Sequence, residues 1–570
     1  METGAGYDEV RASNGRERDR MPEFHLGRYT VFLLVLAAFL GLLVWHPDSW
    51  LGIGAIIVTG LLSLRGIWDL IQTEHAVLRN YPLIGHIRWL VEAIRPEIRQ
   101  YLIEDEKEAM PFSRLQRSLI YSRAKKENDD IPFGTLANVY GEGYEFVLHS
   151  NRPVDAADPD FRITIGNDQC AQPYSASVFN ISAMSFGSLS ANAIRALNKG
   201  AKKGGFYHDT GEGSISPYHR EYGGDIVWEL GSGYFGCRTD DGHFDPERFA
   251  AQAADPQVRM IEIKLSQGAK PGHGGILPAK KVSAEISATR GVPMGIDCVS
   301  PSRHSAFTTP LEMMEFITGL RRLSGGKPVG FKLCIGQPWE FMGIVKAMLV
   351  SGVVPDFIVV DGGEGGTGAA PVEFSDHIGT PMREGLLFVH NVLVGAGLRD
   401  RIKIGAAGKI VSAFDIAHVC AIGADWANSA RGFMFALGCI QSRSCHTNRC
   451  PTGVATQDQS RQRALVVPDK GERVHMFHRR TMHALSEMLA ATGLNHPDEL
   501  QPFHIVHRAT TNQIRQFDQI HRYLEHGELL DGSCELPYYR DNWARAQAES
   551  FFPVQTPRAQ DQRKNPAFNA

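Results

Sequence analysis

The sequence predicts an α/β protein: a (β/α)8 TIM barrel that follows an N-terminal two-helix transmembrane hairpin. The barrel is predicted because, from about residue 175, a short apolar run, a glycine-rich or polar loop and a longer helical stretch alternate eight times. The hairpin is predicted because two long apolar runs, separated by a short polar turn, precede residue 80. Together these patterns indicate a membrane-tethered protein with one large catalytic domain.

The composition is that of a chain with a large core. Of its 570 residues 43% are hydrophobic and 21% are charged, and the formal net charge is -4. Because no basic surface extends over the chain, we expect no nucleic-acid partner. Six of the nine cysteines are scattered singly, without the spacing of a disulfide framework, which favours a reducing compartment.

The two apolar runs are Tyr29–Trp45 and Leu51–Trp68, joined by the turn "HPDS". Tyrosine and tryptophan flank the runs as interfacial anchors. Lysine and arginine are absent from the turn but present before and after the runs, so both ends should face the cytoplasm. We therefore expect the inner cell membrane, contact with its lipid, and a catalytic domain on the cytoplasmic side. A buried hairpin of a soluble domain is the alternative, which Arg65 inside the second run leaves open.

The region that follows alternates apolar and basic residues at helical spacing between residues 78 and 125. This pattern suits a helix on an anionic membrane surface or a linker helix packed on the catalytic domain. The predicted domains are a cytoplasmic tail over 1–28, the hairpin over 29–68, a linker or membrane-proximal region over 69–150, the barrel with its cysteine loop over 151–500 and a C-terminal extension over 501–570.

The barrel strands are predicted from eight apolar runs, with a doubly wound open sheet as the second fold. The run "DIVWEL" (225–230) is a possible strand before "GSGYFG", which fits a dinucleotide-binding pattern. We discard this pattern because no helix begins after it. The eight predicted runs are 177–184, 204–210, 259–265, 293–299, 328–334, 356–362, 401–407 and 424–430.

The loops after these runs are rich in glycine, which lets backbone N–H groups approach an anion or a planar ring. We therefore expect a phosphate-bearing cofactor at this face of the barrel. Its phosphate should lie at the loops after the seventh and eighth strands, near Gly408 and Arg431. The same loops bring charged residues to this face: Glu212, Lys264, Lys270, His273, Lys332 and Asp361.

Three cysteines lie within twelve positions, with the spacing C-x5-C-x4-C and a proline after the last. Three thiolates suit an iron-sulfur cluster with three irons, and His446 offers a fourth ligand for zinc. Iron-sulfur, zinc and a structural accident remain open from spacing alone. The residues are Cys439, Cys445 and Cys450.

At this point five motifs show a resemblance: "AMSFGSLS", "TGEGS", "IKLSQGAKPGHGGILP", "DGGEGGTGAAP" and "GCIQSRSCHTNRCPTGVATQ". Over about residues 150 to 500 they resemble the FMN-binding synthase domain of glutamate synthase. The chain is most similar to the short, membrane-tethered glutamate synthase-like proteins without the glutaminase domain. The resemblance implies a (β/α)8 barrel that holds FMN beside a 3Fe-4S cluster.

The resemblance also implies roles for individual residues. Glu212 or His273 would exchange a proton with the nitrogen during imine formation. The implied cluster ligands are Cys439, Cys445 and Cys450; the implied flavin contacts are Ala183, Met184, Ser185, Lys332, Asp361, Gly362 and Gly363; the implied 2-oxoglutarate contacts are Glu212, Lys264 and Lys270.

The expected activity is that of an oxidoreductase acting on the CH–NH2 group. It would reduce an imine formed from 2-oxoglutarate, or a related 2-oxo acid, and ammonia or an amine, with electrons from ferredoxin or a reductase subunit. The family's "QGAKPGEGGQLP" reads "QGAKPGHGGILP" in this chain, so that His273 replaces an acid and Ile276 replaces a carboxamide. These changes leave the identity of the substrate open. The alternatives are an N-substituted glutamate synthase, a membrane-anchored flavin and iron-sulfur electron-transfer protein, and another FMN-barrel chemistry.

Overall fold

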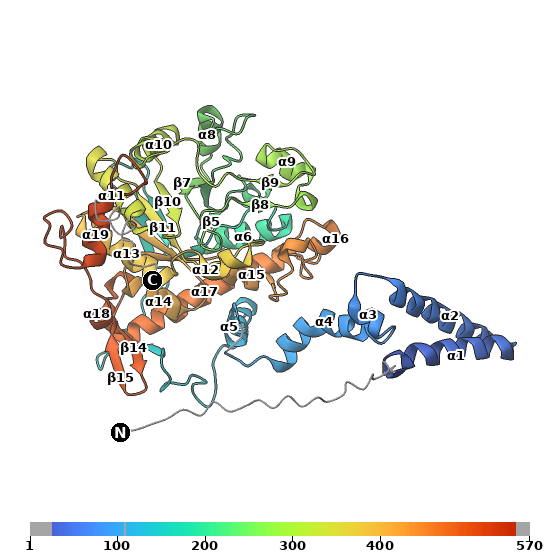
Figure 1. Cartoon of the computed structure of the whole chain (residues 1–570). Helices are drawn as coiled ribbons and strands as arrows, with labels where there is room; N and C mark the ends of the chain where they lie inside the picture. The colour runs from blue at the N-terminus through green and yellow to red at the C-terminus, as the bar shows by residue number, and fades with distance from the viewer. Residues whose placement is uncertain (1–25, 108–109, 555–570) are drawn as a thin grey trace, which may run out of the picture. The chain divides into compact units, whose positions relative to one another are not determined.

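The computed structural model describes residues 26–107 and 110–554 (Figure 1). The chain divides into two compact units, Met1–Asp105 and Glu106–Ala570. The first unit contains the apolar helices and the second contains the barrel.

The first unit is built on a helical hairpin. Helix α1 (Thr30–Trp45) and helix α2 (Trp50–Ile71) are both long and apolar enough to cross a membrane, by length and composition. Ser49 caps α2, because its hydroxyl accepts the N–H of the third helical residue at 3.1 Å. Phe32 is buried against Gly66, where a Cβ atom would lie 2.3 Å from its ring. The two helices predicted from the apolar runs are thus confirmed.

Two shorter helices complete this unit. They are α3 (Ala76–Asn80) and α4 (His86–Ile98), and a π-helical turn continues α4 over Arg99–Ile103. No residue of α4 is buried, and its apolar side chains are exposed. For this part of the predicted 78–125 helix, membrane-surface binding stays a prediction.

The second unit begins with α5 (Arg114–Lys125), which packs on the catalytic body. Ile120 and Ala124 are buried in the main core, and the ring of Tyr121 contacts Phe435 edge to face. For residues 114–125 the linker-helix interpretation is therefore confirmed.

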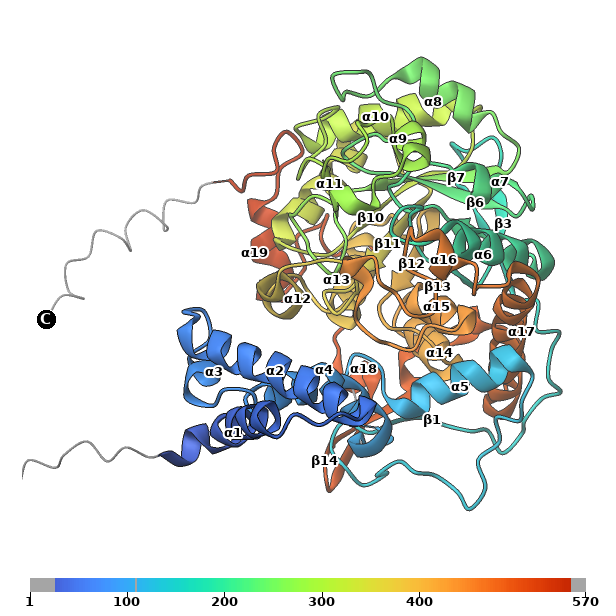
Figure 2. The same cartoon turned by 90° about the vertical axis from the view of Figure 1, so that its right-hand side faces the viewer.

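Eight parallel strands close into a barrel (Figures 1 and 2). This confirms the predicted (β/α)8 fold and excludes the doubly wound open sheet. Around the barrel the strands are β4 (Phe179–Ile181), β5 (His208–Asp209), β6 (Ile226–Leu230), β7 (Val258–Lys264), β10 (Val329–Leu333), β11 (Phe357–Asp361), β12 (Lys403–Ala407) and β13 (Trp426–Ser429).

One of the eight predicted strands is wrong. Run 293–299 contains only β9 (Cys298–Val299), which pairs antiparallel with β8 (Ile276–Leu277) outside the barrel. Its Met294 and Ile296 are exposed, whereas a parallel barrel strand is buried on both faces. The true third strand is β6, all five residues of which are buried.

Helices follow the strands and cover the outside of the barrel. Residues that cap the first turn mark where a helix begins. Helix α10, for example, begins with a capping box in which Thr309 and Glu312 satisfy each other's backbone N–H groups, with Pro310 at its first position. The principal outer helices are α6 (Ala191–Gly204), α7 (Pro217–Arg220), α8 (Pro246–Ala253), α10 (Pro310–Leu323), α11 (Pro338–Ser351), α13 (Met382–Gly395), α14 (Ala413–Ala421), α15 (Arg431–Leu437) and α17 (Val467–Thr492).

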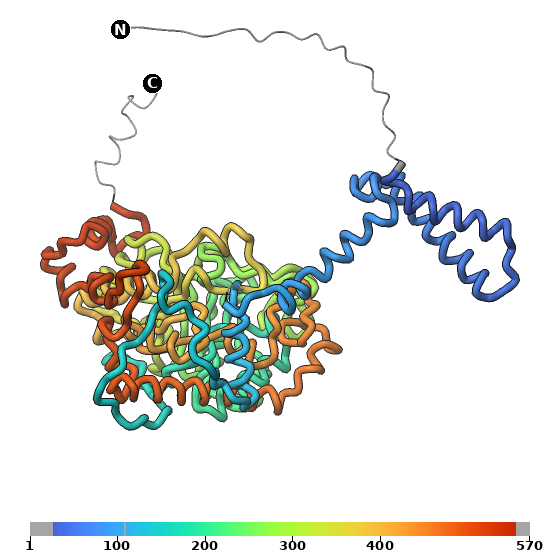
Figure 3. The backbone as a smooth tube through the Cα atoms, turned by 90° about the horizontal axis from the view of Figure 1, so that it is seen from below, coloured from blue at the N-terminus to red at the C-terminus, as the bar shows by residue number. Residues whose placement is uncertain are grey.

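Small additional elements decorate the same body. The C-terminal segment, red in Figure 3, lies against the barrel, where Lys346 of α11 donates to the Trp543 carbonyl at 2.7 Å. The additional elements are β1 (Glu145–Val147), β2 (Arg162–Ile165), β3 (Tyr174–Ser177), β14 (Ile505–Thr510), β15 (Gln513–Gln516), α9 (Ala284–Arg290), α12 (Val372–His377), α16 (Gln459–Gln462), α18 (Phe517–Ile520) and α19 (Pro537–Arg545).

Candidate active site

The carboxyl ends of the barrel strands concentrate ionisable side chains. Strand register brings them together, because Glu229 of β6 pairs with Glu262 of β7, and Lys264 of β7 pairs with Lys332 of β10. Side chains paired in this way point to the same side of a parallel sheet. In a (β/α)8 barrel this end is where active sites are found.

Glu212 and Lys264 form a nearly buried ion pair. The Lys264 Nζ atom lies 2.7 Å from Glu212 Oε2 and 2.6 Å from Gln267 Oε1, and Ser300 donates to Glu212 Oε1 at 3.0 Å. Burial alone would raise the pKa of Glu212, but the Lys264 charge and these hydrogen bonds hold it at about 2. The loop that contains Gly275 passes very close to Glu212, since a Cβ atom at Gly275 would lie 1.8 Å from Glu212 Oε1.

Lys270 is the lysine of this face whose charge has no partner. It is 3% exposed, and within the described chain its ammonium makes no hydrogen bond or ion pair. Burial lowers its pKa, while nearby Glu212 opposes that shift. An anionic ligand group could therefore bind Lys270 without displacing a protein carboxylate.

His273 is half-buried on the same loop. Its Nδ1 atom lies 2.9 Å from the Gly274 carbonyl oxygen, and its ring meets Phe374 edge to face at 5.3 Å. These two contacts fix the orientation of the ring. The Nε2 atom has no hydrogen-bond partner among the described residues, so it can exchange a proton with a ligand.

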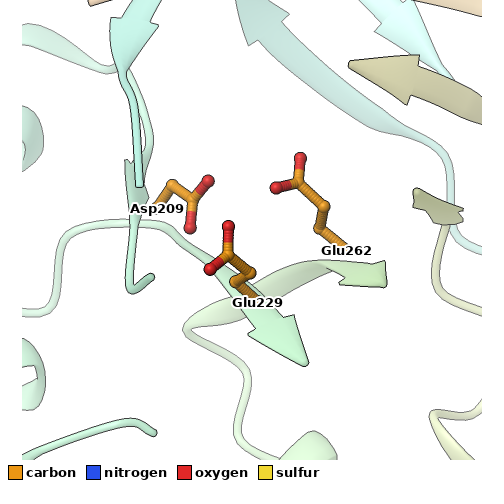
Figure 4. A group of neighbouring side chains, drawn as sticks. All are labelled: Asp209, Glu229 and Glu262. Carbon is orange, nitrogen blue, oxygen red and sulfur yellow. The ribbon is translucent and has the colours of Figure 1, made fainter. Parts of the chain in front are cut away.

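Three buried acids, Asp209, Glu229 and Glu262, lie together inside the barrel (Figure 4) and next to Lys332. The carboxyl oxygens of Asp209, Glu229 and Glu262 lie within 4.8 Å of one another. Lys332 forms an ion pair with Glu229, and its Nζ atom lies 3.3 Å from Glu262 Oε1. Burial raises the pKa of Asp209 to about 7 and that of Glu262 well above its usual range, although Lys332 opposes both. Lys332, with Lys264 at 3.9 Å from Glu229 but shared with Glu212, does not neutralise three carboxylates, so the group holds a proton near neutral pH.

The predicted flavin segments lie on neighbouring loops. Residues 183–185 follow β4, and a Cβ atom at Gly211 would lie 2.7 Å from the Ser185 nitrogen. Asp361 accepts the Gly268 N–H at 2.8 Å, and a Cβ atom at Gly268 would lie 1.7 Å from the Gly362 carbonyl oxygen. Only glycine allows this approach of the loops after β7 and β11. The backbone N–H of Gly363 bonds to Thr380 O at 2.8 Å.

Two cations meet at the loops after the seventh and eighth strands. Gly408 directly follows β12, the next residue is Lys409, and Arg431 opens α15. Burial lowers the pKa of Lys409, and the neighbouring charge of Arg431 lowers it further. Arg431 donates to the Glu364 carbonyl oxygen at 3.2 Å. The Glu364 carboxylate is near enough to oppose the pKa shifts of both residues, and the pair of cations could also bind a phosphate group.

The three clustered cysteines are free thiols on an irregular loop. Gln441, Arg443 and Asn448 of this loop have φ angles of 58°, 54° and 63°. Burial raises the pKa of the Cys439 thiol to about 12, and the nearby Cys445 and Cys450 add to the shift. The thiols are therefore close enough to influence one another's charge.

The surroundings of Cys450 favour a thiolate. Burial raises its pKa, but the Thr452 hydroxyl and the backbone N–H groups of Ala455, Thr452 and Val454 outweigh burial and lower it. Helix α5 covers the other side of the loop, where Tyr121 donates to the Cys439 carbonyl oxygen at 2.5 Å. A thiolate at Cys450 could act as a metal ligand.

The spacing of these donors can be compared with that of a zinc site. Tetrahedral zinc–sulfur bonds of about 2.3 Å place ligand atoms roughly 4 Å apart. Among the described residues, only the three barrel acids place three such ligand atoms within 4.8 Å of one another. The three cysteines and His446 therefore do not form so compact a group.

The sequence did not single out several residues that the structure places at this face. Lys409 lies next to a predicted phosphate residue, and Ser300 belongs to a loop that was noted only as a whole. Glu229 and Glu262 could have been found, because each is a charged residue inside an otherwise apolar strand, "IVWEL" or "MIEIKL".

The fold and this set of side chains define a (β/α)8-barrel protein that gathers lysines and buried acids at the carboxyl ends of its strands. The chain belongs to the glutamate synthase family, because the family model "conserved region in glutamate synthase" matches residues 149–495. The match includes the lysines, the barrel acids and all three clustered cysteines.

The names of similar proteins support this family assignment. The glutamate synthase large subunit-like protein YerD of Bacillus subtilis is 38% identical over 83% of this chain and 98% of its own length. The archaeal-type glutamate synthase [NADPH] of Thermotoga neapolitana is 34% identical over 56% of this chain, and the match spans 60% of that relative. Among solved structures, a flavocytochrome b2 mutant with pyruvate bound overlaps at a TM-score of 0.37 and 13% identity over 77% of this chain and 89% of that chain.

Proposed function

We propose that this protein is an FMN and iron-sulfur oxidoreductase that reduces an imine of a 2-oxo acid and ammonia or an amine to an amino acid. The observation that supports it best is the unpaired, buried Lys270 beside the Glu212–Lys264 ion pair, within the family match. Lys270 would bind a substrate carboxylate, with Lys264 adding charge to the same side.

Glu212 has a narrower role in this proposal than a proton shuttle. A carboxyl group with a pKa of about 2 stays ionised at neutral pH, so Glu212 would stabilise the positive charge of an iminium nitrogen. His273 would exchange the proton with that nitrogen. In this proposal Glu212 stabilises the positive charge and His273 transfers the proton.

The flavin would be held by residues 183–185, Lys332 and the loop over 361–363. Gly408 would allow close approach to its phosphate, and Lys409 and Arg431 would neutralise that group. When bound, FMN would supply the hydride for the imine carbon. The glycines that let these loops meet support this assignment.

The test of the reaction is anaerobic photoreduction of the purified protein, followed by 2-oxoglutarate with ammonia or with methylamine. Either mixture should reoxidise the flavin faster than buffer does, and methylamine tests the N-substituted alternative. Lys270→Met should lose at least tenfold of this rate, whereas the exposed Lys280→Met should keep it. If neither mixture exceeds buffer, the proposed reaction is wrong and an electron-transfer role is favoured.

The cysteine loop would hold a 3Fe-4S cluster through Cys439, Cys445 and Cys450. Electrons from ferredoxin or a reductase subunit would enter there. Cys445→Ser should remove the iron and its electron paramagnetic resonance signal but leave the flavin bound. A Cys445→Ser protein with unchanged iron content would contradict the ligand assignment, and zinc in the wild-type protein would contradict the cluster.

The hairpin would anchor the protein in the inner membrane with both ends in the cytoplasm. Exposed apolar side chains along both helices support this, for example Leu34 at 65% and Leu64 at 66% exposure. The protein should stay in membranes washed with alkaline carbonate, and a reporter fused to either terminus should be cytoplasmic. Extraction by carbonate alone would favour a soluble hairpin.

A further inference from the structure

Lys281 is a buried lysine that the proposed reaction does not use. It ends the short 3-10 turn Ala279–Lys281 and is 3% exposed. Its Nζ atom donates to two carbonyl oxygens, those of Ser188 and Ala455, each at 3.4 Å. Within the described chain no carboxylate pairs with it, although burying an unpaired cation costs several kcal/mol. A negative charge nearby would offset this cost.

The ionisable groups that face Lys281 are the Cys445 and Cys450 thiols of the cysteine loop, which become anionic when they bind a metal. Ala455 links the two, because its carbonyl accepts from Lys281 while its N–H points at the Cys450 sulfur. Burial lowers the pKa of Lys281, whereas the Cys445 and Cys450 thiols raise it. Its other neighbouring cation is Lys280, which is exposed to solvent.

The surrounding backbone fixes this arrangement. Gln457 donates to the Gly187 and Leu189 carbonyl oxygens at 3.0 and 2.8 Å, and the Ser190 N–H bonds to Val454 O at 2.9 Å. These bonds join the loop after β4 to the chain after the third cysteine. Lys281 is held between the two, so its charge cannot turn away to solvent.

We propose that Lys281 is the fixed counter-charge of the cysteine loop and sets the reduction potential of the iron-sulfur cluster bound there. The inference rests on the proposed function, because it requires the cluster. One-electron reduction adds one negative charge to a centre that three thiolates already make anionic. A buried cation stabilises the reduced state more than the oxidised state, and little solvent screens it. Lys281 is thus a positioning residue that acts through the cluster.

The experiment is a redox titration of the full-length, detergent-solubilised protein, followed by the electron paramagnetic resonance signal of the cluster. Lys281→Gln can still donate to the two carbonyl groups but has no charge. It should weaken electron uptake by the cluster about tenfold or more, which is a potential about 59 mV lower. Lys281→Arg should restore the wild-type potential, because it restores the charge.

Lys280→Met is the matched control, since it removes an adjacent but exposed lysine and should leave the potential unchanged. An unchanged potential in Lys281→Gln with full iron content would overturn the inference. If Lys281→Gln lost iron, Lys281→Arg would still test the inference. A lowered reduction potential in Lys281→Arg, which keeps the charge, would also overturn the inference. A wild-type protein without an iron-sulfur signal would instead refute the proposed cofactor.

Discussion

The Glu212–Lys264 ion pair allows a quantitative prediction. The pKa of Glu212 falls from an ordinary 4.5 to about 2, which is 4.5 − 2 = 2.5. At about 1.4 kcal/mol for each pKa unit, this shift corresponds to about 3 kcal/mol of folding free energy at neutral pH. Because the folded pKa is depressed, that stability is present above pH 4.5 and is lost as the pH falls toward 2.

Lys264→Met removes the main source of this stability. Burial then dominates, and the pKa of Glu212 should rise above that of the unfolded chain. We expect the free energy of unfolding at pH 7 to fall by about 3 kcal/mol. The loss should shrink as the pH is lowered, because a protonated Glu212 no longer needs the lysine.

The assay is urea unfolding of the full-length protein in mild detergent, followed by tryptophan fluorescence, with a double-mutant cycle. Lys264→Met/Glu212→Gln removes both charges and should recover most of the lost free energy. Lys280→Met is the control for loss of an exposed lysine and should change the free energy by less than about 0.5 kcal/mol. The reasoning fails if the double variant is as unstable as Lys264→Met.

Three further predictions concern the same face. Gly268→Ala should weaken flavin binding at least tenfold, because its Cβ atom would meet a carbonyl oxygen at 1.7 Å; equilibrium dialysis of FMN tests this, and wild-type affinity would contradict it. Arg443→Glu/Arg449→Glu reverses exposed charge beside the cysteines and should slow reduction by an acidic ferredoxin at low salt; equal rates at all ionic strengths would exclude electron entry there. Burial raises the pKa of Asp209 from an ordinary 3.8 to about 7, so its stabilising effect is lost as the pH rises from about 4 to 7, and Asp209→Asn should gain urea resistance relative to wild type over that range. A pH-independent difference would contradict the proton held by the three acids.

The sequence predicted the structural features that depend on a local pattern of residues. Loops after parallel strands meet at one end of a barrel, so Glu212, Lys264 and Lys332 could be assigned to one face before their distances were known. The helices of the N-terminal hairpin followed from apolar run length. The error at 293–299 has the same origin, since apolar content was counted there without the burial that decides whether a run enters a parallel sheet.

What the sequence could not predict depends on strand register and distant packing. Glu229 and Glu262 become neighbours only through the pairing of β6 with β7. Lys281 meets the cysteine loop across 158 to 169 positions of chain, counted from 281 to 439 and to 450, and nothing in the local sequence "PAKKV" separates it from the exposed Lys280. Such contacts are properties of the tertiary fold.

The ion pairs also decide which lysine an anionic substrate can use. Lys332 and Lys264 already contact Glu229, at 3.9 Å for Lys264, so a ligand that took either lysine would leave a buried carboxylate without its cation. Lys270 has no such partner, and a ligand carboxylate there removes the cost of a buried, unpaired charge. Lys270→Met should therefore weaken binding of 2-oxoglutarate, measured by flavin absorbance titration, while leaving the free energy of unfolding unchanged or higher. A lower stability would mean that Lys270 supports the fold instead of the substrate.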